Sequence, residues 1–438
     1  MTAAAAPASP SAEPSWFGQP RGLTILFLTE MWEQFSFFGM RALLVYYMTK
    51  QLLIPQQRAS LVYGLYAAGV YLTPIFGGVI ADRWLGRRNS VVLGGSIMAL
   101  GHFMMAFEGL FYPALVTIAV GNGLFLPSLP SQIDDLYRRD DPRRHSAYNV
   151  YYVGINLGAF LAPLVAGTVG ETLGWHWGFA VAGIGMVVGL VTYLVGGRYL
   201  PPEPREQRSV WGADAPPRHA ASPAEVRRLF ALLIAIAAVV IVFRCAYEQI
   251  GNTIALWTDE GVDRRVTAGW SIPMTWFQSL NPLIVFLFTP PLVARWTQLS
   301  KAGREPSSVV KMVIGAGLVG ASYAALGAVA WWCAAHGVRA NWLWLAAFFV
   351  AMTTGELFIL PVGLGLFGRL APQGLSATTI ATWFFAGFVG NLLAGWLGSF
   401  WGRLDHGAFF ALTGAVAAFA AALLYLLAAP ARRAEAAA

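Results

Sequence analysis

Two carboxylates, Glu30 and Glu33, lie one helical turn apart within the otherwise apolar stretch 22–48. A spacing of three places both side chains on one face of a helix. A charge at the centre of a membrane span costs at least about 2.5–3.5 kcal/mol, so these acids should face the protein interior or a water-filled cavity. Arg41 returns to nearly the same face roughly 16 Å farther along. Such buried acids could carry protons; the alternative is a salt bridge that only holds helices together.

Three further polar residues lie in later apolar stretches. Arg244 and Glu248 are four residues apart, hence on one helical face, and we expect them to pair because an arginine at membrane depth requires a partner or water. Such a pair could help to bind an anion, or it could be purely structural. Glu356 stands five residues before Pro361, which leaves the carbonyl of Leu357 without its helical donor. We therefore expect a kink and a polar notch beside this acid, which could receive an ammonium group or form an interhelical hydrogen bond.

The elements that position these residues are membrane-spanning helices. Hydrophobic residues make up 57% of the chain and charged residues 12%, whereas charged residues make up about 25% of soluble domains. Apolar runs long enough to cross about 30 Å of hydrocarbon recur along the chain. The twelve predicted spans are approximately 22–48, 59–82, 88–107, 109–136, 145–168, 176–197, 226–257, 268–294, 308–334, 342–369, 375–400 and 406–429. The predicted fold class is an all-α polytopic membrane protein.

The predicted helices form two groups of six. Residues 199–225 are rich in proline, alanine and charged residues and are expected to be a linker between an N-terminal bundle, 22–198, and a C-terminal bundle, 226–429. We expect residues 1–21 to be a disordered tail and not a signal peptide, and residues 430–438 to be a C-terminal tail. Two six-helix bundles are typical of the major facilitator fold, in which the substrate site lies near the midplane between the halves.

Basic residues gather in the loops on one side of the predicted membrane, which places both termini and the linker in the cytoplasm. The net charge of +7 is therefore explained by the orientation of the chain in the membrane, and we expect no nucleic-acid partner. The main basic residues on that side are Arg83, Arg87, Arg88, Arg138, Arg139, Arg143, Arg144, Arg295, Lys301, Arg304 and Arg369.

Chemistry of other kinds is not indicated. Cys245 and Cys333 lie far apart in predicted spans, which suggests buried thiols without a disulfide. The sequence has no metal-ligand spacing, nucleotide-binding loop or nucleophile triad, so we expect no catalytic residue, metal site or cofactor. A membrane enzyme or receptor is the weaker alternative.

Two sets of motifs resemble known transporters. The loop GGVIADRWLGRR resembles the signature loop of the major facilitator superfamily and implies a cytoplasmic gate formed by Asp82, Arg83, Arg87 and Arg88. The stretches TEMWEQFSFFGMR, NVYYVGINLGAFLAP, FRCAYEQIG, IPMTWFQSLNPL and GELFILPVGL are similar, in order and spacing, to motifs of the proton-dependent oligopeptide transporter family. The linker has no room for the two additional helices that many bacterial members have between the bundles.

The resemblance implies roles for individual residues. The acids linked to protons would be Glu30, Glu33 and Glu248. The substrate-binding residues would be Arg41, Tyr71, Asn156, Arg244, Trp276, Asn281, Glu356 and Trp383. Among these, Glu356 matches the acid that receives the amino terminus of a peptide in the family. The Asn156 amide suits a peptide backbone, although a helix-packing role is the alternative, and the aromatic residues and Asn281 could equally be packing residues.

The chain also departs from the family pattern. Gln34 replaces the arginine that follows the second glutamate, and Leu126 replaces the lysine of the fourth helix. Phe37 and Phe38 replace paired tyrosines. We expect Arg244 and Arg41 to supply the anion recognition that the first two replacements remove.

The sequence thus predicts a proton-coupled symporter of the bacterial inner membrane that imports di- and tripeptides by alternating access. We expect a monomer whose partners are small peptides, protons and the lipid bilayer. The alternatives are a proton-coupled antiporter that exports drugs or metabolites, or a carrier of a non-peptide substrate on the same fold.

Overall fold

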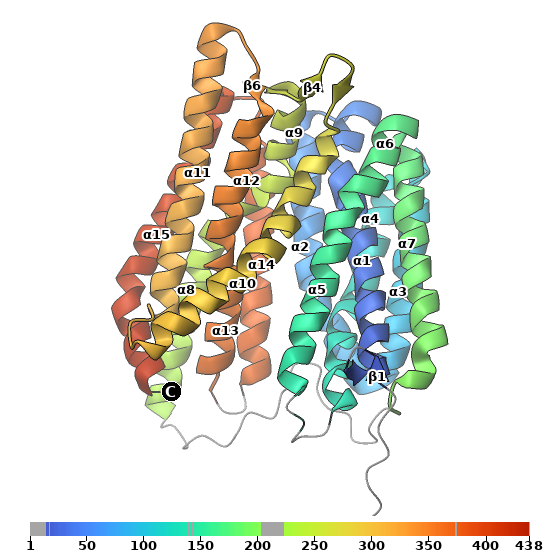
Figure 1. Ribbon diagram of the computed structural model, residues 1–438, viewed down its shortest axis with the longest axis vertical. Helices are drawn as coiled ribbons and strands as arrows, with labels where there is room; N and C mark the ends of the chain where they lie inside the picture. Colours follow the sequence, from blue (N-terminus) through green and yellow to red (C-terminus); the bar gives the residue numbers. More distant parts are fainter. Residues whose placement is uncertain are drawn as a thin grey trace, which may run out of the picture.

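The computed structural model describes residues 15–16, 18–137, 141, 143–202, 223–372 and 375–437. Long helices stand side by side in two groups, α1–α7 and α8–α15 (Figure 1). Helices α1 and α8, the first of each group, begin at the same end of the molecule (Figure 1). We call this end the linker side and the opposite end the far side.

In the N-terminal bundle, α1 packs against α5 and α7, and α3 packs against α4 and α7. The helices of this bundle are α1 (Arg21–Tyr46), α2 (Gln56–Ile80), α3 (Arg87–Met104), α4 (Phe111–Ser128), α5 (Arg144–Ala162), α6 (Thr168–Leu173) and α7 (Trp175–Gly196).

In the C-terminal bundle, α11 packs against α12 and α15, and α8 packs against α14 and α15. Its helices are α8 (Pro223–Tyr247), α9 (Thr253–Glu260), α10 (Leu280–Lys301), α11 (Ser308–His336), α12 (Trp342–Leu357), α13 (Leu360–Leu370), α14 (Ser376–Gly398) and α15 (His406–Ala437).

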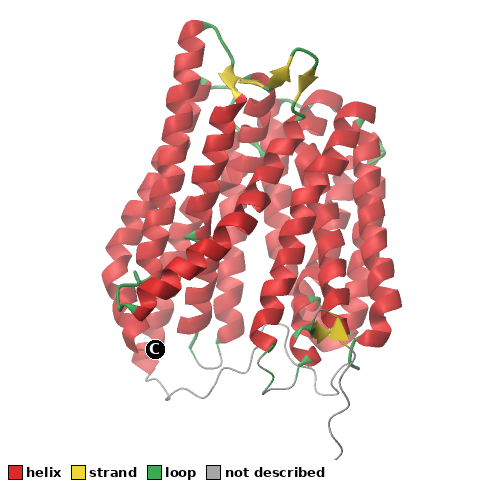
Figure 2. Ribbon diagram, viewed as in Figure 1, coloured by secondary structure: helices red, strands yellow, loops and turns green. Residues whose placement is uncertain are grey.

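Extended structure in the described residues is confined to the two ends of the molecule (Figure 2). Strands β1 (Ser15–Trp16) and β2 (Gln19–Pro20) form a hairpin on the linker side. On the far side, β3 (Val262–Asp263) pairs with β6 (Ala340–Asn341), and β4 (Arg265–Thr267) pairs with β5 (Trp270–Ser271). Helices dominate because a chain within the bilayer must satisfy its backbone polar groups internally.

The described residues contain ten helical stretches long and apolar enough to cross a membrane. These ten stretches do not include α1 and α3, which pack within the N-terminal bundle; with α1 and α3 added, the helices are consistent with the predicted twelve spans. The prediction of an all-α polytopic protein is confirmed.

Proline breaks one span as the sequence predicted. Helix α12 ends at Leu357 and α13 begins at Leu360, with Pro361 in its first turn. Proline fits there because the first N–H groups of a helix have no intrahelical acceptor. The backbone carbonyl of Glu356 instead accepts from Ile359 N at 2.9 Å. The break therefore lies directly beside the Glu356 side chain.

The two chain ends differ from the expected tails. The β1–β2 hairpin lies within the segment expected to be disordered, and Tyr137 Oη donates to Gln19 Oε1 at 2.8 Å to hold it. Helix α15 continues through the expected C-terminal tail to Ala437, where Glu435 accepts from Ser308 N. The sequence missed both because each depends on contacts with distant residues. Residues 1–14 and 203–222, which include most of the expected linker, lie outside the described residues, as do Arg138 and Arg139.

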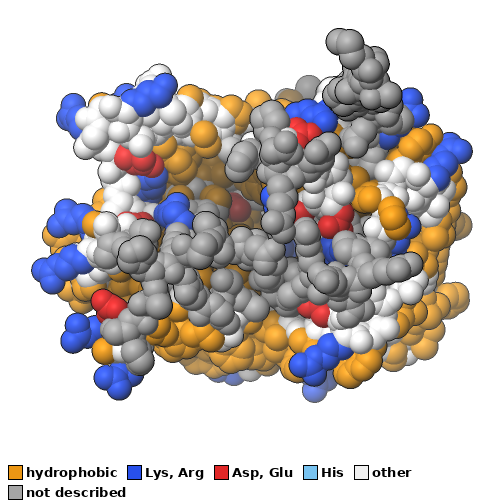
Figure 3. All heavy atoms as spheres, turned by 90° about the horizontal axis from the view of Figure 1, so that it is seen from below, with side chains coloured by type: hydrophobic (Ala, Val, Ile, Leu, Met, Phe, Trp, Pro, Cys, Tyr) orange, Lys and Arg blue, Asp and Glu red, His pale blue; other side chains and the backbone are white. Residues whose placement is uncertain are grey.

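Contacts between the bundles gather on the far side. Lys50 Nζ lies 2.6 Å from Asp259 Oδ2, and Ser60 Oγ donates to Asn252 Oδ1 at 3.0 Å. Helices α2 and α14 cross at Gly64, where an added Cβ would lie 2.5 Å from the Cα of Gly395. Only glycine permits this approach. The linker side is more open. Figure 3 views the molecule from this side and shows a hollow in its surface.

Candidate functional site

A three-residue ionic cluster joins the two bundles. Glu248, at the start of the short helix η8 (Glu248–Gly251), accepts from Arg41 Nη2 at 2.9 Å and from Arg244 Nη1 at 3.0 Å. Arg41 also donates from Nε to Tyr63 Oη at 2.7 Å. Arg244 donates to Tyr71 Oη at 3.1 Å and places its guanidinium 4.8 Å from the centre of that ring. The predicted pairing of Arg244 with Glu248 is confirmed, whereas the bridge from Glu248 to Arg41 was not predicted.

The charges in this cluster do not balance. Arg244 and Glu248 are almost fully buried, with exposed fractions of 3% and 2%. Two guanidinium groups share one carboxylate, which leaves one excess positive charge. Buried charge is costly unless it is matched, so the cluster favours a further anionic group nearby.

Next to the cluster, a cavity of about 180 Å³ lies between the bundles. This is small compared with the 300–1,000 Å³ or so typical of sites for drug-sized ligands, which favours a compact ligand. Its lining residues come from α1, α2, α4, α14 and η8: Glu33, Gln34, Phe37, Phe38, Arg41, Tyr63, Tyr66, Ala67, Val70, Tyr71, Asn122, Leu126, Glu248 and Asn391.

Several buried polar atoms around this cavity have no hydrogen-bond partner among the described residues. They are Glu33 Oε2, Tyr66 Oη and Asn391 Oδ1 in the wall, together with Arg244 Nε in the adjoining cluster. An unsatisfied buried polar group costs about 1–3 kcal/mol. The wall is therefore suited to a polar ligand or to ordered water.

The two acids of α1 have different surroundings. Glu30 accepts from Tyr151 Oη at 2.5 Å and from Gln34 Nε2 at 3.1 Å. Glu33 lines the cavity and keeps one oxygen without a partner among the described residues. Arg41 does not pair with either acid in this arrangement, since its guanidinium contacts Glu248 and Tyr63. Of the two, Glu33 is thus the acid that a ligand or a water molecule in the cavity can reach.

A second polar cluster surrounds Glu356 at the break between α12 and α13. Asn281 Nδ2 donates to Glu356 Oε2 at 2.5 Å and to Thr353 Oγ1 at 3.0 Å. Tyr247 also hydrogen-bonds to Glu356, and Arg244 and Glu248 lie close enough to interact with its charge. The acid predicted from the sequence therefore lies near the ionic cluster, with Asn281 holding its carboxylate.

Three other predicted residues lie outside the cavity lining. Asn156 Nδ2 donates to the carbonyl of Tyr152 in its own helix at 2.9 Å. Trp276 Nε1 donates to Thr168 Oγ1 at 2.7 Å and joins the bundles on the far side. Trp383 is buried against Phe367, with ring centres 5.1 Å apart. A contact between these residues and a ligand stays a prediction.

The signature-loop residues connect elements at the linker side. Asp82 and the exposed Arg83 lie in the π-helical segment η2 (Ala81–Leu85). Arg87 Nη2 lies 2.7 Å from Asp135 Oδ2. Arg88 donates to the carbonyls of Leu200 and Pro201, at 2.7 Å and 2.6 Å. In this arrangement Arg87 and Arg88 hold the N-terminal bundle together internally.

The departures from the family pattern fall in the cavity wall. Gln34, Phe37, Phe38 and Leu126 all line it. The wall formed by α1 and α4 is therefore less basic than the resemblance implies. The nearest guanidinium groups are instead Arg41, from α1, and Arg244, from the C-terminal bundle.

Sequence reasoning missed Tyr63, Tyr66, Asn122 and Asn391 in the wall and Tyr151 as the partner of Glu30. Tyr63, Tyr66 and Val70 follow the spacing of one helical face, a signal that could have extended the search from Tyr71. Tyr151 lies within the motif NVYYVGINLGAFLAP, but the motif does not show which residue it approaches, because its contact with Glu30 joins residues 121 apart in sequence. Among the described residues, no three His, Cys, Asp or Glu side chains are grouped to hold a metal ion.

Curated relatives match almost the whole chain. A di-/tripeptide transporter of Lactococcus lactis subsp. cremoris is 32% identical, over 95% of this chain and 97% of the relative. A peptide transporter of Yersinia enterocolitica is also 32% identical, over 88% of each chain.

Solved structures show the same fold. The chain is similar to a peptide transporter POT in complex with sulfate, with a TM-score of 0.86 and 28% identity over 96% of this chain and 97% of that one. It is also similar to a POT family transporter in complex with 5-aminolevulinic acid, with a TM-score of 0.84 and 25% identity over 95% and 98% of the two chains. The family model described as "PTR2: POT family" matches residues 88–215 and 213–409. Since these matches cover most of the chain and its two-bundle architecture, the protein belongs to the POT family of transporters.

Proposed function

We propose that the protein is a proton-coupled symporter that imports di- and tripeptides by alternating access. The names of its relatives support peptides as the substrate class. The observation that carries the proposal furthest is the ionic cluster beside the cavity, in which Glu248 bridges Arg41 and Arg244. A peptide presents an ammonium group and a carboxylate, and this region offers both acids and guanidinium groups to receive them.

The proposed substrate contacts follow from this charge arrangement. The peptide carboxylate meets Arg244 and Arg41, and the amino terminus meets Glu356. Tyr71 and Asn156 contribute hydrogen-bonding groups beside the ligand. Three further residues support the site. Asn281 orients Glu356, and Trp276 takes part in the far-side contacts. Trp383 packs against Phe367.

Coupling to protons follows from the charge balance in the wall. When Glu33 is neutral, the two arginines and Glu248 carry one excess positive charge, which a peptide carboxylate matches, while the peptide ammonium group matches the charge of Glu356. When Glu33 is ionised, the wall is already balanced and a carboxylate would add an uncompensated negative charge. Proton and peptide therefore favour each other's binding, which is the requirement for symport. Glu30 and Glu248 complete the proposed set of proton-linked acids.

Alternating access requires that the far-side contacts and the linker-side hollow exchange roles. The described arrangement is closed on the far side and hollowed on the linker side. We assign the linker side to the cytoplasm of a bacterial inner membrane, with both termini there, because its loops are rich in arginine. Asp82, Arg83, Arg87 and Arg88 then form the cytoplasmic gate of a monomer.

Uptake into proteoliposomes tests the proposal. With acid outside, labelled dialanine should accumulate inside, and a protonophore should abolish accumulation. Valinomycin-clamped voltage separates the pH gradient from the membrane potential. Export of a dye or an antibiotic on the same gradient, without peptide uptake, would instead support the antiporter.

A further inference from the structure

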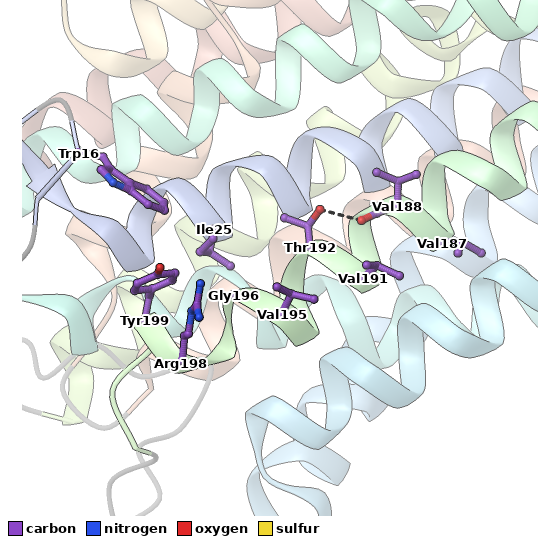
Figure 4. Close-up of a pocket in the computed structure, with 10 residues that line it drawn as sticks. All are labelled: Trp16, Ile25, Val187, Val188, Val191, Thr192, Val195, Gly196, Arg198 and Tyr199. Carbon is purple, nitrogen blue, oxygen red and sulfur yellow. Dashed lines mark hydrogen bonds between the residues drawn. The ribbon is translucent and has the colours of Figure 1, made fainter.

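A groove on the outer surface of the N-terminal bundle is separate from the cavity between the bundles. It has a volume of about 610 Å³ and runs along the last turns of α7 beside Ile25 of α1 (Figure 4). Its long wall consists of valines: Val187, Val188, Val191 and Val195. Thr192 Oγ1 donates to the carbonyl of Val188 at 2.7 Å, so its hydroxyl proton is used within the helix. The groove is thus apolar along most of its length, and it lies on a face that meets the bilayer.

The linker-side end of the groove has a different chemistry. Trp16 of the β1–β2 hairpin and Tyr199 of η7 (Gly197–Tyr199) lie there (Figure 4), with ring centres 5.3 Å apart. Arg21 places its guanidinium 5.3 Å from the Trp16 ring and 5.7 Å from the Tyr199 ring. Arg198 lies 4.8 Å from the Tyr199 ring. Aromatic and basic side chains together are typical of the membrane–water interface.

The positive charge at this end meets no acidic side chain among the described residues that line the groove. The Nε of Arg21 is buried and has no hydrogen-bond partner in the described part of the chain. The aromatic rings shield the two guanidinium groups but do not neutralise them.

The groove is also held in shape by its neighbours. Arg88 binds the carbonyls of Leu200 and Pro201, directly after η7. A Cβ at Gly196 would lie 2.5 Å from Ile25 Cγ2, so glycine at this position lets α7 pack closely against α1. A site that exists before its ligand arrives loses less entropy on binding.

We propose that this groove binds an anionic phospholipid of the linker-side leaflet. One acyl chain lies along the valines of α7, and the phosphate lies between Arg21 and Arg198. Guanidinium groups suit this position because they bind phosphate oxygens through two parallel hydrogen bonds. Trp16 and Tyr199 then pack at the level of the glycerol group.

Native mass spectrometry of the full chain in detergent tests this site. We expect the first phosphatidylglycerol to bind about tenfold more tightly than phosphatidylcholine, because each arginine near an anionic headgroup contributes to the attraction. The double variant Arg21→Gln/Arg198→Gln should bind the two lipids equally. Val191→Trp fills the apolar part of the groove at an exposed position and should weaken the binding of both lipids.

Arg403→Gln is the matched control, since that guanidinium lies 5.7 Å from the Phe400 ring on the far side. It should keep the preference for phosphatidylglycerol. An undiminished preference in the Arg21→Gln/Arg198→Gln variant would overturn the proposal. So would displacement of phosphatidylglycerol by inorganic phosphate, because the groove would then be a site for a free anion. If the double variant does not fold, Val191→Trp still tests the site, because unchanged binding of both lipids by this variant would also overturn the proposal.

Discussion

At the scale of single residues, our proposal assigns the role of two cations of the family pattern to the arginines around Glu248. Gln34 and Leu126 leave the wall of α1 and α4 without the expected arginine and lysine. Arg244 places a guanidinium on the opposite side of the cluster, 3.0 Å from Glu248. In our proposal, Arg244 of the C-terminal bundle and Arg41 of the N-terminal bundle take the place of those two cations.

The first prediction concerns the carboxylate of the peptide. Arg244→Gln removes a charge-assisted hydrogen bond worth about 1.5–3 kcal/mol, so the affinity for free dipeptides should fall about ten- to a hundredfold. Dipeptides with an amidated C-terminus should lose little. Competition against labelled dialanine measures both classes.

Leu126→Lys in the Arg244→Gln background should restore part of the lost affinity, since Leu126 lines the same cavity. Equal binding of free and amidated dipeptides by the unaltered protein would mean that no carboxylate is recognised here.

The second prediction concerns Glu33. Glu33→Gln fixes the neutral form, so exchange of peptide across the membrane should continue while accumulation driven by a pH gradient is lost. Counterflow and gradient-driven uptake in the same proteoliposomes separate these two activities. Glu108→Gln alters an exposed acid that accepts from Gln51 and should leave both activities unchanged. If Glu33→Gln still accumulates peptide on a pH gradient, another acid carries the proton.

The residues that sequence reasoning found and missed differ in how local their contacts are. Arg244 and Glu248 are separated by one turn, so helical geometry was sufficient to pair them. Arg41 and Glu248 are 207 residues apart, and only the docking of two bundles brings them together. Tyr151 was missed for the same reason, since its contact with Glu30 depends on how α1 and α5 pack.

At the scale of elements, we propose that the crossing of α2 and α14 controls closure of the far side. Gly64 and Gly395 allow the two backbones to approach, and Ser60 and Asn252 hydrogen-bond close by. The sequence did not predict this pairing, because Gly64 and Gly395 are far apart in the chain. The break at Pro361 could be predicted because proline acts within its own helix.

The third prediction tests this crossing. Gly64→Val should prevent close approach at a cost of about 1–3 kcal/mol and shift the protein toward a state open on the far side. In that background, Ser60→Cys should react about tenfold faster with a membrane-impermeant thiol reagent applied from the far side. Ser60 is fully buried in the present arrangement.

Gly317→Val provides the comparison, because nothing lies within 4 Å of a Cβ added at Gly317. It should leave the reactivity of Ser60→Cys unchanged. Equal reactivity in the Gly64→Val and Gly317→Val backgrounds would show that the crossing does not control far-side closure.

At the scale of the whole molecule, composition and the length of apolar runs were sufficient to predict a two-bundle membrane protein, because lipid permits few other folds. They could not predict which side the bundles close on. That depends on contacts between residues far apart in sequence, chiefly those between α2 and α14. The docking of the β1–β2 hairpin was missed for the same reason.

The most direct measurement of the central claim is proton entry driven by peptide alone. Dialanine is added outside proteoliposomes that contain a pH-sensitive dye, with equal pH on both sides and the voltage clamped. We predict that the lumen acidifies as the peptide enters, and that Glu33→Gln abolishes the acidification while exchange continues. Peptide entry with no change in lumenal pH would contradict proton-coupled symport.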